Sequence, residues 1–284
     1  DRGVDGSQFR RIGTGVSFEK RRPGALVSRL EAAVSYNYTD HVMDNYTLRT
    51  FQPSMMSPTP SAMNPDRTTY GGRVLAVLAR NDLTVETGID LQTNTHTTKS
   101  SMRQDSVPVE TLPRVSDARF ANIGVFGELD YRAGARTRMV GGLRIDRATG
   151  TDLRGSVALS MMENLPNPTA GHRRTDALAS GFVRIEQGMS TWPVTLYAGL
   201  GRVRRFPDYW ELVTKESQVS PSAFDTRPET TTQLDAGAQV RRGATSAYIS
   251  TYASVVDDFI LIESNYAKSG IMGARLATVT RNVN

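Results

Sequence analysis

A histidine and a methionine stand two residues apart in the stretch HVMDNY, as His41 and Met43. Both side chains can bind a metal ion. The thioether is soft and suits Cu(I), whereas imidazole accepts copper in either oxidation state and also zinc. Ca²⁺ and Mg²⁺ prefer oxygen ligands and would leave Met43 without a role. The residue types therefore favour copper, although a His-x-Met pair by itself is more often an ordinary piece of surface.

The remaining candidates for chemistry are weaker. Met55, Met56 and Met63 lie in the proline-rich stretch FQPSMMSPTPSAMNP, where they could act as an accessory surface that captures a soft metal. His96 and His172 stand alone in polar segments, and we expect both to be solvated. The sequence contains no cysteine, which removes disulfides and thiolate metal ligands. Because there is no Ser-His-Asp order, phosphate loop or nucleophile elbow, we assign no enzyme activity, catalytic residue or catalytic cofactor.

The directions of these side chains depend on the elements that carry them, and two-residue alternation dominates the chain. In the stretch LTVETGIDLQ the polar residues Glu86 and Asp90 lie on one face, and the other face holds Leu83, Val85, Ile89 and Leu91. Alternation of this kind predicts β-strands. We count about eleven strands, at residues 11–21, 28–46, 68–80, 83–95, 119–132, 137–149, 175–187, 192–203, 229–241, 246–262 and 275–284.

Short and long connections alternate along the chain. Long polar segments lie between short turns, which are predicted at 23–26, 80–82, 133–136, 188–191 and 241–245. A soluble β-sandwich does not require this alternation. A transmembrane β-barrel does, with short turns at one rim, long loops at the other, apolar residues toward lipid and a polar lumen. The sequence therefore predicts an all-β, antiparallel, up-and-down transmembrane β-barrel in contact with a lipid bilayer.

The predicted strand number does not close such a barrel, because bacterial barrels of this type usually have an even number of strands. The last run, LATVTRNVN, also lacks the terminal aromatic residue expected of a closing strand. We therefore expect residues 1–284 to be one part of a larger barrel, with open edges at 11–21 and 275–284. Such a segment should not be a functional pore by itself, since a sheet edge cannot face lipid with unpaired backbone groups.

Strand periodicity gives His41 and Met43 a direction. From Leu30 to Tyr38 the even-numbered residues are apolar, and the odd-numbered residues from Glu31 to Thr39 are small or polar. Side chains alternate between the two faces of a strand, so His41 and Met43 fall on the polar face, toward the lumen. A strand crosses the membrane in ~9–11 residues, which places position 41 near the external mouth. Residues two apart on a strand are separated by about 6.6 Å, so both side chains can reach one ion.

The charge pattern argues against nucleic acid as a partner. The formal charge of +5 comes from 34 basic and 29 acidic residues scattered through the sequence, and no Lys/Arg block is interleaved with aromatic residues. Several carboxylates fall on lumen-facing strand positions. Paired with Arg144, Arg184 and Arg241 they would stabilise a wet interior or hold an inner domain; they are Glu86, Asp90, Glu128, Asp130, Asp146 and Asp235.

Several motifs resemble those of TonB-dependent outer-membrane receptors. GRVRRFPDYWELV (201–213) resembles the segment in which a strand rises into a loop that begins Arg-x-Pro and ends Glu-Leu. RPETTTQLDAGAQVRRG (227–243) and SAYISTYASVVDDFILI (246–262) resemble the two strands that follow. In this family a barrel of about 22 strands encloses a plug domain. The variant RFPDYWEL, together with YNYTDHVMDNYTLR (36–49), is most similar to the TonB-dependent copper receptors.

This resemblance implies both a function and partners. It implies a receptor segment of the bacterial outer membrane that takes up copper ions, energised through the TonB complex of the inner membrane. In the copper receptors the plug contributes a Cys-x-x-x-Met pair to the metal site, so the resemblance implies that His41 and Met43 form the barrel half. We recognise no TonB box, plug or closing C-terminal strand in this sequence, and expect these parts to lie outside it.

Two alternatives remain open. A receptor for a siderophore or another metal chelate would bind a large organic complex through aromatic and arginine-rich loops, and substituting His41 would matter little. A structural or adhesive outer-membrane barrel would bind a partner through its loops and would have no metal affinity. Neither alternative requires His41 and Met43 to share a face.

Overall fold

A computed structural model describes residues 4–55, 57–160, 163–269 and 274–284, so Met56 lies outside the described residues. Strands dominate. In the described part of the chain the helical elements are a single turn, α1 (Tyr209–Leu212), and a short 3₁₀ segment at Val109–Thr111. Across the same residues we find no helix with the length and hydropathy needed to span a bilayer.

Long antiparallel strands form one 12-stranded sheet. Each long strand pairs with the next one along the chain, and the short strands β3 (Ala62–Met63) and β6 (Ser100–Ser101) extend the sheet beside β2. The predicted all-β, antiparallel, up-and-down order is confirmed, and each predicted strand from 11–21 to 229–241 corresponds to one long strand. The long strands are β1 (Asp5–Arg21), β2 (Val27–Asp44), β4 (Asp66–Arg80), β5 (Leu83–Thr98), β7 (Val115–Arg132), β8 (Thr137–Asp152), β11 (Arg173–Gly188), β12 (Val194–Arg205), β13 (Glu229–Arg242) and β14 (Thr245–Asp257).

The end of the chain differs from the prediction. The predicted strand 246–262 breaks at Asp258, whose φ of 54° lies in the left-handed region, so β15 (Phe259–Lys268) begins as a separate element. It pairs with β16 (Arg275–Val283) in a two-stranded sheet of their own. The expectation that 275–284 is an open edge of the main sheet is therefore wrong, because β14 is that edge. At the other end β1 pairs only with β2, as predicted, and a further small sheet joins β9 (Ser156–Ser160) to β10 (Glu163–Pro166).

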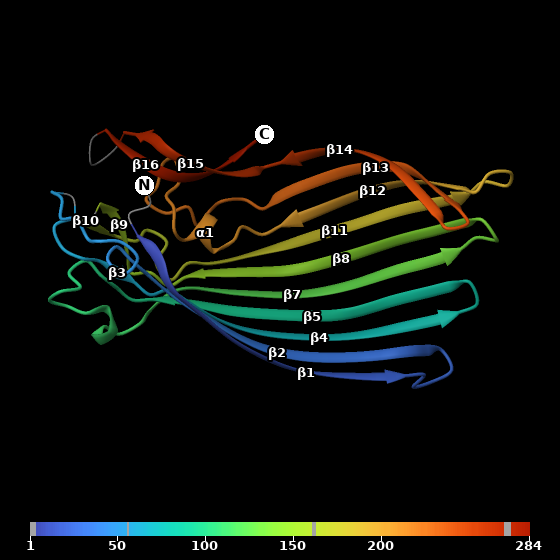
Figure 1. Ribbon diagram of the computed structural model, residues 1–284, viewed down its shortest axis with the longest axis horizontal. Coiled ribbons are helices and arrows are strands. Elements are labelled where there is room, and N and C mark those ends of the chain that lie inside the picture. Colours follow the sequence, from blue (N-terminus) through green and yellow to red (C-terminus); the bar gives the residue numbers. More distant parts are fainter. Residues whose placement is uncertain (1–3, 56, 161–162, 270–273) are drawn as a thin grey trace.

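The two ends of the main sheet differ, with tight turns at one end and long loops at the other (Figure 1). We call them the turn rim and the loop rim. Several turn residues adopt positive φ, among them Asn81 (51°), Gly134 (89°) and Gly243 (58°). Glycine and asparagine reach this region most readily, which lets the chain reverse within a few residues. The sequence positions of the tight turns are thus explained by residue type.

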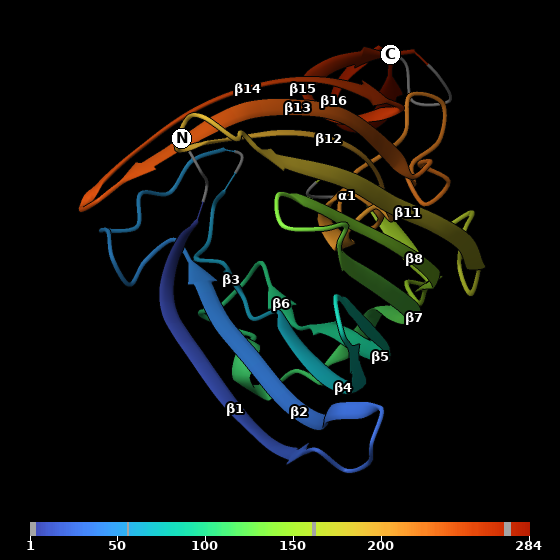
Figure 2. The ribbon, with the colours of Figure 1, turned by 90° about the vertical axis from the view of Figure 1, so that its right-hand side faces the viewer.

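The sheet is curved and has a concave and a convex face (Figure 2). Cross-strand register places Val74, Ile89, Val125 and Ile145 in one row on one face, where Ile145 is 63% exposed. On the opposite face the side chain of Arg144 in β8 extends across β7 and forms an ion pair with Asp90 of β5. Side chains of non-adjacent strands can meet in this way on the concave side of a curved sheet, so this face is the concave one. The convex face is therefore apolar and the concave face polar. As predicted, Glu86 and Asp90 lie on the concave face, and the convex set includes Leu83, Val85, Ile89 and Leu91.

A small hydrophobic core lies at the loop rim. Leu212, Val213 and Phe224, from the segment between β12 and β13, pack against Ala118 of β7. A capping box starts α1: Asp208 accepts a hydrogen bond from the backbone N–H of Glu211, whose side chain accepts one from the N–H of Asp208. This core attaches the segment 206–228 to the sheet, and the main sheet itself contributes little to it because its convex apolar residues are exposed.

Candidate metal site at the loop rim

His41 and Met43 occupy the loop-rim end of β2, which ends at Asp44. His41 and Met43 are odd-numbered, like Ala33 and Ser35 of the same strand, and therefore share their face of the sheet. The cross-strand partners of Ala33 and Ser35 on β4 lie on the concave face. Both side chains therefore lie on the concave face, and both are half-buried. The structure thus brings the two candidate ligands to the same face at the mouth of the curved sheet.

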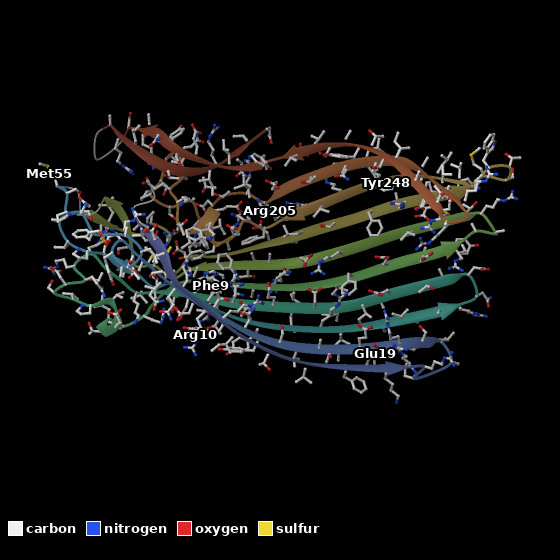
Figure 3. All side chains as sticks on the ribbon, in the orientation of Figure 1. Phe9, Arg10, Glu19, Met55, Arg205 and Tyr248 are labelled. Atoms are coloured by element: carbon white, nitrogen blue, oxygen red, sulfur yellow. The ribbon has the colours of Figure 1, made fainter. Side chains whose placement is uncertain are left out.

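Phe9 of β1 is the cross-strand partner of His41. The two ring centroids are 6.2 Å apart with an interplanar angle of 34°, and Phe9 is 71% exposed. Phe9 and Arg10, both labelled in Figure 3, are successive residues of β1. Their side chains therefore lie on opposite faces of the strand, and that of Phe9 lies on the face of His41. Within the described part of the chain, the imidazole of His41 has no hydrogen-bond partner. Its nitrogen atoms are therefore available to a ligand.

Met63 lies directly opposite Met43. The pair continues the antiparallel register of β2 and β4 beyond the partners Asp40 and Asp66. Residues directly opposite each other have Cβ atoms about 4.5–5.5 Å apart and point to the same side of the sheet. Met63 is 41% exposed. One accessory methionine of the sequence prediction therefore joins His41 and Met43 on one surface.

Hydrogen bonds fix the backbone around this pair. The side-chain amide of Asn64 donates to the carbonyl oxygen of His41 at 2.9 Å, and the backbone N–H of His41 donates to the carbonyl of Pro65 at 3.3 Å. Just beyond Met43, the buried carboxylate of Asp44 accepts from the backbone N–H of Thr47 at 2.7 Å. The end of β2 is thereby held rigid, which presents its side chains in a defined direction.

Met55, the other loop methionine that the structure describes, lies apart from this surface. Met55 is 99% exposed at the outer tip of the loop after β2 (Figure 3). Met56 belongs to the residues that the structure does not describe. Of the two accessory candidates that the structure describes, Met63 is the one whose cross-strand register brings it next to Met43.

The donor set available here is one imidazole with thioethers. No group of three or more His, Cys, Asp or Glu side chains able to hold a metal ion occurs among the described residues. An imidazole and thioethers suit a soft or borderline ion such as copper and suit neither Ca²⁺ nor Mg²⁺. The surface can hold copper weakly by itself, and tight binding requires further donors facing it.

Toward the turn rim, the concave face carries a network of ion pairs. Arg144 bonds Asp90 at 2.7 Å and Asp146 at 2.5 Å, and Arg138 bonds Asp130 at 2.6 Å. Glu86 has weaker ion pairs with Arg29 at 3.7 Å and Arg73 at 3.8 Å, and Arg184 pairs with Glu186 at 2.9 Å. Glu128 and Asp235, also concave, have no ion-pair partner within the described chain. The wall is charged, and Arg144 pairs with two of the predicted carboxylates. Arg184 pairs with a carboxylate outside the predicted set, and Arg241 has no ion pair among the described residues.

His96 does not stand in a solvated loop. It lies in β5, with its ring stacked on Tyr209 at 4.0 Å between centroids and 3° between planes, and edge-on to Phe120 at 5.9 Å. Burial lowers the pKa of His96 to about 4. The expectation of a solvated residue is therefore wrong for His96, because the segment 206–228 folds over it. His172 is exposed, with its ring 6.1 Å from that of Phe224.

Sequence reasoning missed one neighbour of the site, Phe9, and named another, Met63, without predicting its position opposite Met43. Phe9 belongs to the adjacent strand, and its contact with His41 depends on the register between β1 and β2. The position of Met63 depends on a two-residue strand within an irregular loop. The sequence signal that could have placed these two residues is their distance along the chain from the turn residues. That distance fixes the pairing register of the strands only when the geometry of the connecting loop is known.

The entire chain, residues 1–284, matches the family model described as TonB dependent receptor-like, beta-barrel. The chain belongs to the TonB-dependent receptor β-barrel family. Receptors of this family are outer-membrane proteins. In barrels of that membrane an apolar outer face meets lipid and a polar inner face lines the lumen.

Comparison with solved structures supports the same fold. The copper transporter OprC is 43% identical to this receptor chain with a TM-score of 0.90, over 99% of this chain and 44% of that chain. The hemophore receptor HasR of Serratia marcescens, solved with its hemophore and heme, has a TM-score of 0.70 at 17% identity over 96% of this chain and 44% of that chain. The iron transporter FrpB of Neisseria meningitidis has a TM-score of 0.63 at 13% sequence identity, over 96% of this chain and 38% of that chain.

HasR and FrpB, at these identities, show the fold alone. The receptor chain spans less than half the length of each of these structures. A search of curated proteins finds no match.

Proposed function

We propose that residues 1–284 form part of the β-barrel of a receptor that takes up copper ions across the bacterial outer membrane, with His41 and Met43 as the barrel's metal ligands. The observation that carries the proposal is an imidazole that has no hydrogen-bond partner among the described residues, beside a thioether, both on the concave face at the loop rim. The 43% identity to a copper transporter supports the same ion.

The convex face supports placement in a membrane. On β7 the exposed convex residues run from Tyr131 at the turn rim to Ile123, including Leu129 and Val125. The eight steps between these residues, at roughly 3.3 Å each, give about 26 Å along the strand. At the usual strand tilt of about 35–45° this is about 20 Å along the membrane normal, most of the ~25 Å apolar band of outer-membrane barrels. The loop rim, with His41 and Met43, then faces the exterior.

Copper is cargo in this proposal. His41 and Met43 bind an arriving ion, and the soft thioether favours Cu(I) over harder competing ions. Met63, opposite Met43, acts as an accessory ligand, and the exposed Met55 makes at most a weak first contact. The barrel does not need to change its fold to bind copper, because its strands are held by backbone pairing.

Further parts of the receptor complete the function in this proposal. A plug domain inside the full barrel supplies sulfur ligands that face His41 and Met43, and further strands close the barrel. The TonB complex energises release of the ion toward the periplasm. The charged concave wall, with free carboxylates such as Glu128 and Asp235, provides a surface that a plug can contact.

The test is copper occupancy of the purified full-length receptor, measured by metal analysis. His41→Ala and Met43→Ala should each lower copper binding while the barrel keeps its resistance to unfolding by heat, since strand pairing is unchanged. Met55→Ala is the matched control and should have much less effect. If both site variants keep full copper occupancy, the copper assignment fails. Uptake of a ferric or cupric chelate by those variants would then favour a chelate receptor, and absence of any metal uptake would favour a structural or adhesive barrel.

A further inference from the structure

Three arginines lie on the convex face at the loop rim, on three neighbouring strands. Arg119 of β7 and Arg173 of β11 are both cross-strand partners of Thr151 of β8 and flank it from the two sides. Arg147 lies four residues away on β8, opposite Ile123. All three side chains are exposed. We call Arg119, Arg147 and Arg173 the rim arginines.

The spacing of the rim arginines suits a single ligand. Adjacent strands are about 4.8 Å apart, so the backbones of Arg119 and Arg173 are about 10 Å apart. Arg147 lies about 13 Å from Thr151 along the central strand. Side chains at these positions do not meet at one point on a convex face, but they lie within the span of one headgroup that carries more than one phosphate. The floor between them carries hydroxyl groups, including the bonded pair Thr149 and Thr175 with Oγ1 atoms 3.2 Å apart.

No carboxylate in the described part of the chain forms an ion pair with the rim arginines. None of the three has an ion pair or hydrogen bond in the described chain. The convex faces of the fully described strands β8 and β11 carry no Asp or Glu, and Asp117 of β7, which has the parity of Arg119, accepts a hydrogen bond from Tyr209 instead. The concave arginines of β8 behave differently, since Arg138 and Arg144 are both bonded to carboxylates. The same strands therefore pair their inner arginines and leave their outer arginines open.

The rim arginines stand at the upper border of the apolar band. Below them toward the turn rim lie Val125, Leu143 and Ile145, of which Leu143 is 75% exposed and Ile145 63% exposed. Elsewhere along the same border the charge differs: β2 and β4 carry Asp40 and Asp66 there, both close to Arg114 at 3.6 and 3.2 Å. Three such open arginines therefore gather on the neighbouring strands β7, β8 and β11, whereas on β1 the exposed Arg10 of the same face lies opposite Asp40.

We infer that the rim arginines form a binding site for a phosphate-bearing glycolipid headgroup of the outer leaflet, whose acyl chains lie against the apolar wall below. Guanidinium groups bind phosphate through paired, charge-assisted hydrogen bonds, and the apolar wall accepts hydrocarbon chains. An amphiphile with anionic groups above its chains matches both surfaces. The inference rests on the outer-membrane placement proposed above and is independent of copper binding.

The test uses the full-length receptor in detergent and lipid A carrying two phosphates as the probe, with affinity measured by native mass spectrometry. The combined variant Arg119→Gln, Arg147→Gln and Arg173→Gln should weaken binding at least about tenfold, because each basic residue near a lipid surface contributes to anion binding. Lipid A with both phosphates removed should bind the wild-type receptor as weakly as intact lipid A binds the variant. Binding to the wild type should also weaken as salt is raised.

The matched control is Arg80→Gln, because Arg80 is an exposed arginine on the same face of β4 but at the turn rim. It should leave the affinity for lipid A unchanged. Copper occupancy of all variants should equal that of the wild type, which shows that they are folded and separates this test from that of the copper site. Equal affinity of wild type and triple variant, or equal binding of intact and dephosphorylated lipid A by the wild type, would overturn the inference.

Discussion

Met43 on β2 and Met63 on β3 are direct cross-strand partners at the loop rim, and His41 lies on the same face of β2. This relationship separates Met63 from Met55, although both come from the same proline-rich stretch. We predict that Met63→Ala lowers the Cu(I) affinity of the full-length receptor about two- to tenfold, which corresponds to as much as about 1.4 kcal/mol. Met55→Ala should leave it within error. Competition with a Cu(I) chelator gives the affinities, and equal effects of the two substitutions would contradict the prediction.

The two ligands of β2 should differ in the ions they select. Met43→Ala removes a soft donor and should weaken Cu(I) more than Zn(II), whereas His41→Ala removes a donor that both ions accept. Metal titrations of the purified receptor with each ion measure the ratio of the two affinities. A Met43→Ala variant whose Cu(I) and Zn(II) affinities fall by the same factor would show that the thioether is not a ligand.

An aromatic ring of the concave wall lies across a glycine of the neighbouring strand. A Cβ atom added at Gly142 would lie 2.6 Å from Cε1 of Phe182. Gly142→Ala should therefore lower the free energy of unfolding by about 1 kcal/mol, because the half-exposed ring of Phe182 must turn away from its preferred rotamer.

Gly127→Ala is the matched control for that substitution, since its nearest neighbours would be 3.9 Å away. Urea unfolding in lipid vesicles compares the two variants. Equal stability of the Gly142→Ala and Gly127→Ala receptors would show that the ring is free to move.

The ion pairs of Arg144 should stabilise the wall only while its two carboxylates are charged. Arg144→Met leaves Asp90 and Asp146 facing each other without the cation that bonds both. We predict a loss of about 1–3 kcal/mol in the free energy of unfolding. Adding Asp90→Asn and Asp146→Asn to that variant should restore a substantial part of the loss. Unfolding curves of the two variants decide the matter, and absence of any recovery would show that the loss comes from packing of the arginine.

The segment 206–228 should respond to pH through two buried groups above the apolar band. Burial raises the pKa of Asp117, which accepts a hydrogen bond from Tyr209 at 3.1 Å, to about 6, and burial lowers that of His96 to about 4. The raised carboxyl pKa gives stability that is complete below the usual value of 3.8 and is lost as pH rises through 6. The lowered His96 pKa gives stability that is present above 6.5 and is lost as pH falls toward 4.

The two groups therefore act in opposite directions between pH 4 and 6. Asp117→Asn removes the carboxyl contribution, so the attachment of α1 in that variant should weaken more steeply than in the wild type as pH falls from 6.5 to 4. Hydrogen exchange of residues 206–213 measures this opening. Identical pH profiles of wild type and Asp117→Asn would contradict the assignment.

The sequence by itself determined the strands, their order and their faces. Alternation is a property of neighbouring residues. It follows from alternation alone that Glu86 and Val85 lie on opposite faces of their strand and that His41 and Met43 lie on the same face. The tight turns likewise follow from local chemistry, because residues such as Asn81 and Gly134 adopt positive φ readily.

Only the tertiary structure decided which distant residues meet. The stacking of His96 on Tyr209, the placement of Met63 beside Met43, and the grouping of Arg119, Arg147 and Arg173 each depend on strand register or on the path of a long loop. Register shifts by whole residues with the number of residues in each connection, and loops are shaped by contacts with parts of the chain far away in sequence. The same reason explains the break at Asp258, where β15 leaves the main sheet to pair with β16. Periodicity fixes the face of a side chain, but its neighbours across the sheet are fixed by pairing.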